Sequence, residues 1–130
     1  MAKWHGISRR KPTGGRLKRP NRYRGKRRTE VASEEQLAFV GEKDARKNYR
    51  KRSGSQTVRA LTVNQVNINK KDGKTIRATV KNVAGNDADP NYVRRNIVTK
   101  GAILETDAGM VRVTSRPGMH GVVSGVPVDE

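Results

Sequence analysis

The first 28 residues, MAKWHGISRRKPTGGRLKRPNRYRGKRR, limit what this chain can fold into. They contain twelve Lys and Arg side chains and no Asp or Glu, and four glycines and two prolines are interspersed among them. Gly and Pro disfavour a helix of any length, and too few apolar side chains are present to offset the entropy of ordering by burial. We therefore expect an open, self-repelling segment that an external polyanion neutralises and orders.

Most of the excess positive charge of the 130-residue chain lies in this segment. The formal net charge is +17, from 29 basic and 12 acidic residues, and residues 1–28 supply +12 of it. Residues 29–56 contribute +1 and residues 57–130 contribute +4. Together with the pattern of apolar residues, this asymmetry predicts an extended arm at 1–28, an irregular connector at 29–45 and a β-barrel at 46–130.

From residue 57 onward the pattern is typical of short β-strands. Apolar residues alternate with polar ones at 58–68, where the alternation changes phase twice, and at 76–80 and 111–113. Two short buried strands are predicted at 97–98 and 102–104, and a last strand, broken by Gly125 and Pro127, at 122–128. The sequence Lys70-Lys71-Asp72-Gly73-Lys74 predicts a tight hairpin, and Arg116-Pro117-Gly118 predicts a turn. The predicted fold is all-β: a small six-stranded barrel with a long extended basic N-terminal arm.

Between the arm and these strands the sequence supports two alternatives. Ser33-Glu34-Glu35-Gln36 has the N-cap residue and early acids of a helix start. Leu37, Phe39 and Val40 are equally consistent with one short strand. The run Ser53-Gly54-Ser55, which follows a highly charged stretch, predicts a turn.

No residues in the sequence form a recognisable catalytic or metal site. The chain has no cysteine and two histidines, His5 and His120. Asp87 and Asp89 lack the Gly and distal Glu of a calcium loop, so we expect them to cap a loop. No run approaches the ~20 apolar residues of a membrane span, and no signal peptide is evident. We expect a cytoplasmic binding protein that is not an enzyme, with no cofactor, metal, small-molecule substrate, membrane contact or homo-oligomer.

The arm has the composition of a nucleic-acid-binding segment. Arg binds phosphate in a bidentate manner, Gly14-Gly15 would let backbone amides approach phosphates, and Trp4 and Tyr23 are suited to stacking on unpaired RNA bases. The alternatives are a solvated basic tail and, for Trp4, packing on protein. The arm residues that we expect to contact RNA are Lys3, Trp4, Arg9, Arg10, Lys11, Thr13, Gly14, Gly15, Arg16, Lys18, Arg19, Arg22, Tyr23, Arg24, Lys26, Arg27 and Arg28.

Basic residues in the part predicted to fold are further candidates for RNA contacts. Taken singly, each is ordinarily a solvated surface charge, so an interface requires that they share a face. The candidates are Arg50, Lys51 and Arg52 beside the Ser-Gly-Ser turn, Arg94, Arg95 and Lys100 near Tyr92, and Arg116 in a later turn.

Three segments of the chain resemble one known family. They are WHGISRRKPTGGRL at 4–17, NYVRRNIVTKGAILET at 91–106 and VTSRPGMHGVVSG at 113–125. They are similar to the eighth small-subunit ribosomal protein of archaeal and eukaryotic type, in its short archaeal form, which is distinct from the bacterial protein of the same ordinal. Residues 53–61 resemble the basic hairpin of that family. Residues 29–41 depart from it, since Glu30–Glu35 replaces a Gly-Arg-Glu-Pro-like run.

The resemblance implies a structural constituent of the small ribosomal subunit that binds and stabilises ribosomal RNA during assembly and translation. Its implied partners are small-subunit ribosomal RNA and neighbouring ribosomal proteins. The resemblance also implies a strand around Lys47–Arg52 that pairs with Gln56–Val63. From the residues alone, the alternative is a DNA-compacting chromosomal protein, although the Gly and Pro content of the arm and the lack of a groove-reading helix argue against it.

Overall fold

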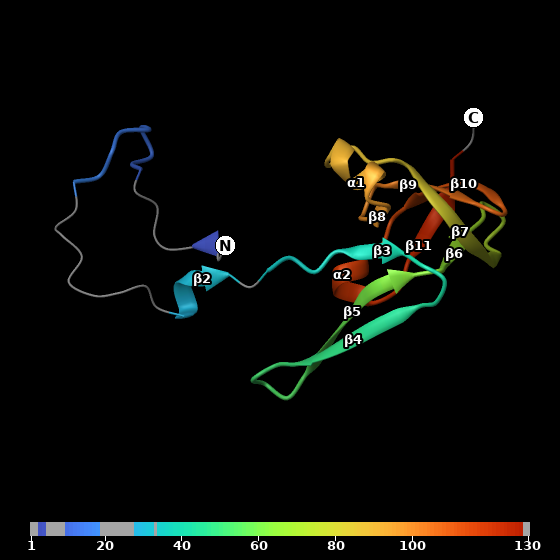
Figure 1. Cartoon of the computed structure of the whole chain (residues 1–130), viewed down its shortest axis with the longest axis horizontal. Helices are drawn as coiled ribbons and strands as arrows, with labels where there is room; N and C mark the ends of the chain where they lie inside the picture. The colour runs from blue at the N-terminus through green and yellow to red at the C-terminus, as the bar shows by residue number, and fades with distance from the viewer. Residues whose placement is uncertain (1–2, 5–9, 19–27, 33, 129–130) are drawn as a thin grey trace. The chain divides into compact units, whose positions relative to one another are not determined.

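The computed structural model describes residues 3–4, 10–18, 28–32 and 34–128. The chain divides into two compact units, Met1–Glu35 and Gln36–Glu130 (Figure 1). None of the helices in the described ranges is long and apolar enough to cross a membrane.

The described residues of the first unit form short backbone pairings. Strand β1 (Lys3–Trp4) pairs antiparallel with β2 (Val31–Ala32), which the 3-10 turn η1 (Arg28–Glu30) precedes. Arg10 and Arg16 form an isolated antiparallel bridge around a tight turn. Residues 10–16 thus form a local hairpin where charge alone led us to expect an open chain, because Gly14 adopts φ +83° and lets the turn close. The expectation of an extended arm over 1–28 stays a prediction.

Five strands of the second unit form a closed barrel within the described part of the chain. Their order around the barrel is β10 (Gly109–Val113), β11 (Ser124–Pro127), β6 (Gln65–Asn69), β7 (Thr75–Gly85) and β9 (Ile103–Thr106). All neighbouring strands are antiparallel except β11 and β6, which pair in parallel at Ser124↔Asn67 and Gly125↔Ile68. The expected count of six barrel strands is therefore not confirmed.

The other strands of this unit form a four-stranded sheet. Its order is β4 (Ala45–Arg50), β5 (Gln56–Val63), β3 (Ala38–Val40) and β8 (Ile97–Val98). Strands β4 and β5 form an antiparallel hairpin, which confirms the pairing that the family resemblance implied. The strand β3 confirms the strand alternative for residues 37–40, and residues 34–37 are not helical. Ser33, the expected N-cap, lies outside the described residues.

The predicted turns are present, one of them in a different form. The turn between β6 and β7 has Gly73 at φ +78°, and the Lys70 N–H donates to the Lys74 carbonyl at 2.9 Å. The expected turn at Arg116 begins the short helix α2 (Pro117–His120), because Pro117 is pre-set for a first helical position. The Asp89 carboxylate accepts from the Asn91 N–H at 2.8 Å, so Asp89 is a cap as expected, but it caps the one-turn helix α1 (Pro90–Arg94) and not a loop.

The core is continuous between the barrel and the sheet. Its largest fully buried side chains come from β6, β8, β9 and β10, and they are Val66, Ile68, Ile97, Leu104, Val111 and Val113. Ala60 and Val63 of β5 belong to the same buried cluster as the barrel residues. The alternating positions at 78 and 80 and at 111 and 113 therefore face one core, whereas Val122, Val126 and Val128 of the last predicted strand are exposed. The shared cluster holds the sheet against the barrel.

Candidate nucleic-acid interface

The hairpin of β4 and β5, residues 45–63, has six cationic side chains and no acidic one. The cations are Arg46, Lys47, Arg50, Lys51, Arg52 and Arg59. Every residue of β4 is exposed except Tyr49, which is half-buried. Figure 1 shows that the hairpin extends away from the barrel. A projecting, acid-free and cation-rich element is suited to contact with a polyanion.

The tip of this hairpin is a turn that glycine makes possible. The Lys51 N–H donates to the Ser55 carbonyl at 2.8 Å, and the Gly54 N–H donates to the Lys51 carbonyl at 3.0 Å. Gly54 adopts φ +84°, and nothing lies within 4 Å of where its Cβ would be. The same two hydrogen bonds recur in the turns at 11–15 and 70–74. Each of these turns begins with a lysine, so each tip has a cationic side chain.

Further along the hairpin, two cations lie against one aromatic ring. Lys47 Nζ is 5.3 Å and Arg59 Cζ is 5.1 Å from the centroid of the Tyr49 ring. The Tyr49 hydroxyl donates to Gln36 Oε1, which fixes the ring. Sequence reasoning missed Lys47 and Arg59 as interface residues. The available signal was the two-residue spacing of Lys47 and Tyr49, which places both side chains on one face of a strand.

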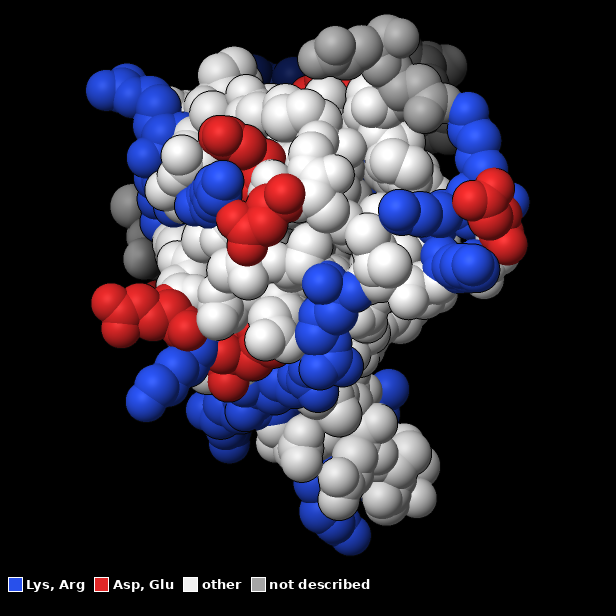
Figure 2. Space-filling view, turned by 90° about the vertical axis from the view of Figure 1, so that its right-hand side faces the viewer, with Lys and Arg blue, Asp and Glu red and all other residues white. Residues whose placement is uncertain are grey.

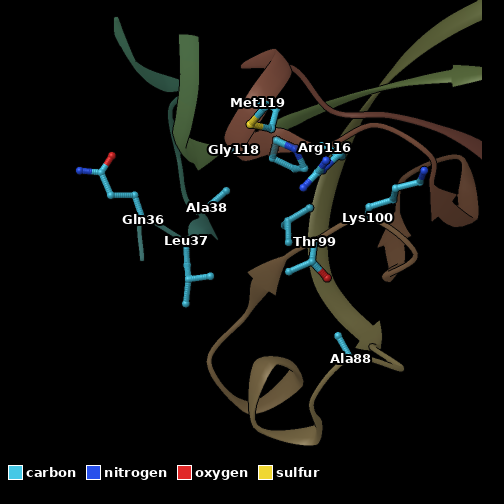
Figure 3. A pocket seen from close by; sticks show the side chains of 11 residues that line it. Gln36, Leu37, Ala38, Ala88, Thr99, Lys100, Arg116, Gly118 and Met119 are labelled. Atoms are coloured by element: carbon cyan, nitrogen blue, oxygen red, sulfur yellow. The ribbon is translucent and has the colours of Figure 1, made fainter. Parts of the chain in front are cut away.

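Lys100 and Arg116 line the same hollow, whose volume is about 410 Å³. It lies between the β3 segment and α2, and Ala38, Thr99 and Met119 are also in its lining. Figure 3 shows the Arg116 guanidinium turned toward the hollow, whereas the Lys100 amino group extends away from it. The Arg116 N–H donates to His120 Nδ1 at 3.2 Å, so the histidine has a hydrogen-bonding role in α2.

Arg94 and Arg95 lie at the end of α1. The Arg95 Cζ atom is 5.9 Å from the centroid of the ring of Phe39, a residue that is 37% exposed. Figure 1 shows α1 apart from the tip of the β4–β5 hairpin, with β3 between them. The structure therefore groups Lys100 with Arg116 but does not gather every predicted cation at one place.

The predicted arm residues are only partly described. Residues 10–18 are exposed, and Lys3 and Trp4 are described through the backbone pairing of β1. The Gly14 N–H donates to the Lys11 carbonyl at 2.9 Å, so this amide is used within the turn. The Arg10 Nη1 atom donates to the Gly14 carbonyl at 2.9 Å. The predicted contact residues that lie outside the described part are Arg9, Arg19, Arg22, Tyr23, Arg24, Lys26 and Arg27.

The charge on the folded unit outside the hairpin is mixed. Figure 2 shows acidic and basic side chains intermingled on the face that it presents. Lys81 Nζ and Asp107 Oδ1 form an exposed ion pair at 3.4 Å. Across the residues that the structure describes, no group of three or more His, Asp or Glu side chains is arranged to hold a metal ion.

Comparison with known proteins agrees with the sequence resemblance. The family Ribosomal protein S8e matches residues 4–128 of this chain. The chain belongs to the ribosomal protein S8e family. A small ribosomal subunit protein eS8 from Methanospirillum hungatei is 45% identical over 127 residues, which cover 97% of this chain and 98% of the relative. The eS8 proteins of Halobacterium salinarum and Haloarcula marismortui are 47% and 48% identical over 98% and 95% of this chain, and over 98% and 97% of their own lengths.

The S8e match includes the segments that carry the candidate interface. The hairpin at 45–63, the α1 segment and the α2 segment all lie within the matched range. The chain covers nearly the full length of these relatives, so the comparison applies to the S8e protein as a whole.

Proposed function

We propose that this protein is a structural constituent of the small ribosomal subunit that binds and stabilises ribosomal RNA and catalyses no reaction. The observation that carries the proposal is the match, over nearly the whole chain, to archaeal relatives named small ribosomal subunit protein eS8. In this proposal the protein acts in the cytoplasm within the ribosome. Its partners are small-subunit ribosomal RNA and neighbouring ribosomal proteins, with no cofactor, metal or small-molecule substrate.

The proposed roles of the segments follow the distribution of charge. The arm at 1–28 and the tip of the β4–β5 hairpin neutralise phosphates, and the barrel with its four-stranded sheet positions these cationic segments. Each neutralised phosphate releases counterions, so the affinity falls with salt by a slope of about 0.9 per contact on a duplex and about 0.7 on a single strand. Phosphate contacts of this kind fix orientation, and base contacts add specificity.

Filter binding at several salt concentrations tests the proposal. The full chain is titrated with fragments of small-subunit ribosomal RNA and with double-stranded DNA of equal length. Tighter binding to one or more of the RNA fragments, with a linear dependence of log affinity on log salt, supports the proposal. Equal affinity for RNA and DNA, with cosedimentation of the tagged protein with chromosomal DNA instead of small subunits, would favour the chromosomal alternative.

The contribution of the arm is tested in the full chain with matched charge variants. One variant replaces Arg9, Arg10, Arg16 and Arg19 with Gln, and the control replaces Lys70, Lys74, Arg77 and Arg112 with Gln. Both remove four charges, so a general electrostatic effect is equal in the two. We expect the arm variant to lose much more RNA affinity and salt dependence than the control. Equal losses would show that the arm is only a solvated basic tail.

A further inference from the structure

We propose that Lys47 and Arg59 form a binding site for a backbone phosphate of RNA, with Tyr49 as the residue that positions both. This site deepens the proposed function and rests on it. It lies on the β4–β5 hairpin below the tip, and neither cation was among the residues expected from sequence to contact RNA.

The first argument is an unfavourable arrangement of charge. Lys47 and Arg59 are directly opposite each other in the register of β4 and β5. Directly opposed residues on neighbouring strands have Cβ atoms about 4.5–5.5 Å apart, and like charges in such a pair are destabilising. The hairpin at 45–63 contains no Asp or Glu that could separate or neutralise them. An arrangement that repels in the free protein becomes favourable when an anion bridges the two cations.

The second argument is the environment of the Arg59 guanidinium. Its Nε atom is buried, and within the described part of the chain it has no hydrogen-bond partner. Arg59 as a whole is only half-buried, so other atoms of the side chain reach solvent. The planar fork of a guanidinium matches the geometry of phosphate oxygens. A phosphate would therefore stabilise a cation that the protein desolvates without neutralising.

The third argument concerns preorganisation. Both cations lie near the Tyr49 ring, and the tyrosine hydroxyl donates to Gln36 Oε1, so the ring is fixed at its far end. Cation–π contacts hold Lys47 and Arg59 in place without cancelling their charge. Tyr49 is consequently a positioning residue. Less of the conformational entropy of two long side chains is lost on binding when they are already held.

The surroundings favour RNA over an acidic protein segment as the source of the anion. Lys47 shares the hairpin with Arg50, Lys51 and Arg52, of which Arg50 is on the other face of β4 and Lys51 and Arg52 follow the strand at the tip. A hairpin with cations on both faces and at its tip, and with no acid among them, is suited to several phosphates of one backbone. The occupant of the Lys47–Arg59 site is thus a phosphate in a strand whose neighbouring phosphates contact the tip.

The test measures RNA binding and thermal unfolding in full-length single variants. Arg59→Met removes the charge and keeps an unbranched side chain, and Arg112→Met is the matched control because Arg112 is an exposed cation on β10 of the barrel. For Arg59→Met we expect about tenfold weaker binding to small-subunit ribosomal RNA, as for loss of a charge-assisted hydrogen bond, and a salt slope smaller by about 0.7–0.9. We expect the Tm of the free variant to be unchanged or higher, because a like-charge repulsion is removed.

Two further variants separate a phosphate site from a structural role. Lys47→Met combined with Arg59→Met should lose less affinity than the product of the single losses, because both cations bind the same phosphate. Tyr49→Leu keeps every charge and should weaken RNA binding several-fold through lost positioning. A lower Tm for Arg59→Met with RNA affinity equal to that of Arg112→Met would show a structural role and overturn the inference.

The outcomes also distinguish this inference from the proposed function. If the unsubstituted protein prefers RNA and Arg59→Met behaves like Arg112→Met, the Lys47–Arg59 site is wrong and the proposed function stands. If the unsubstituted protein does not prefer RNA to DNA, both the proposed function and the Lys47–Arg59 site are wrong. Tighter binding of a polyglutamate peptide than of RNA, abolished in Arg59→Met, would assign the site to an acidic protein partner and overturn the inference.

Discussion

Gly121 lies directly against Val58, so that a Cβ atom on Gly121 would come within 2.6 Å of Val58 Cγ1. Gly121 is buried, ends α2 and has φ +71°. The close approach of α2 to β5 therefore depends on a residue without a side chain. This contact fixes the Arg116 segment against the strand that carries Arg59.

Gly121→Ala should destabilise the protein by about 2–4 kcal/mol, because alanine is strained at this left-handed φ and its Cβ would overpack against Val58. Urea unfolding measures the change. Gly54→Ala is the matched control, since Gly54 also has positive φ but has nothing within 4 Å of its Cβ position. We expect the control to lose about 1 kcal/mol from strain alone. Equal losses in the two variants would contradict the packing argument.

Gly125→Ala should disrupt the closure of the barrel. Its Cβ would lie 2.6 Å from both the Arg112 carbonyl oxygen and Val111 Cγ1. Because one of these atoms belongs to the backbone of the neighbouring strand, relief requires β10 and β11 to separate, and we expect a loss of about 3 kcal/mol or more. Gly85→Ala on β7 is the control, with its nearest atom at 3.8 Å. A Tm of Gly125→Ala close to that of the control would refute this prediction.

Asp44 caps the junction of β5 and β6 from a distant part of the chain. Its Oδ1 atom accepts from the Asn64 N–H at 2.6 Å and from the Gln65 N–H at 3.3 Å. Asp44→Ala should cost about 1 kcal/mol because two backbone donors then rely on water at this exposed site. Asp44→Asn keeps an acceptor and should lose less. Asp87→Ala serves as a comparison with the same change of charge, and the prediction fails if its unfolding midpoint falls as far as that of Asp44→Ala.

The hairpin tip should contribute to RNA binding without contributing to stability. Arg50, Lys51 and Arg52 are exposed, so replacing all three with Gln should leave the Tm within about 2 °C of the unsubstituted value, as expected for surface changes. The salt slope of RNA binding should fall by about 2–3 if each cation contacts a phosphate. Filter binding gives the slope, and calorimetry gives the Tm. An unchanged slope would remove the tip from the proposed interface.

Local chemistry made several elements predictable. The sequence Lys70–Lys74 predicts its hairpin because a glycine at the fourth position supplies the positive φ that this turn needs. Val111 and Val113 alternate with polar neighbours, which predicts a strand with one buried face. Asp89 could be recognised as a cap because its carboxylate acts on a residue two positions away.

Long-range pairing decided what the sequence alone could not. Residues 34–40 satisfy a helix start and a strand equally well, and the pairing of Phe39 with Thr62 and Ile97 selects the strand. Strand β5 joins the four-stranded sheet, so the barrel closes with fewer strands than expected among the described residues. Strand register also determines which cations meet. Lys47 and Arg59 are twelve positions apart in the chain, and only the β4–β5 pairing places them at one ring.

The parallel pairing of β11 with β6 has a consequence for folding during synthesis. Residues 124–127 are the last of the barrel to be synthesised, and they join a strand at 65–69 that was made long before. During translation, therefore, both strands of the cationic hairpin at 45–63 are made before the strand that closes the barrel. The segments suited to phosphate are thus available to RNA before the scaffold that carries them is finished.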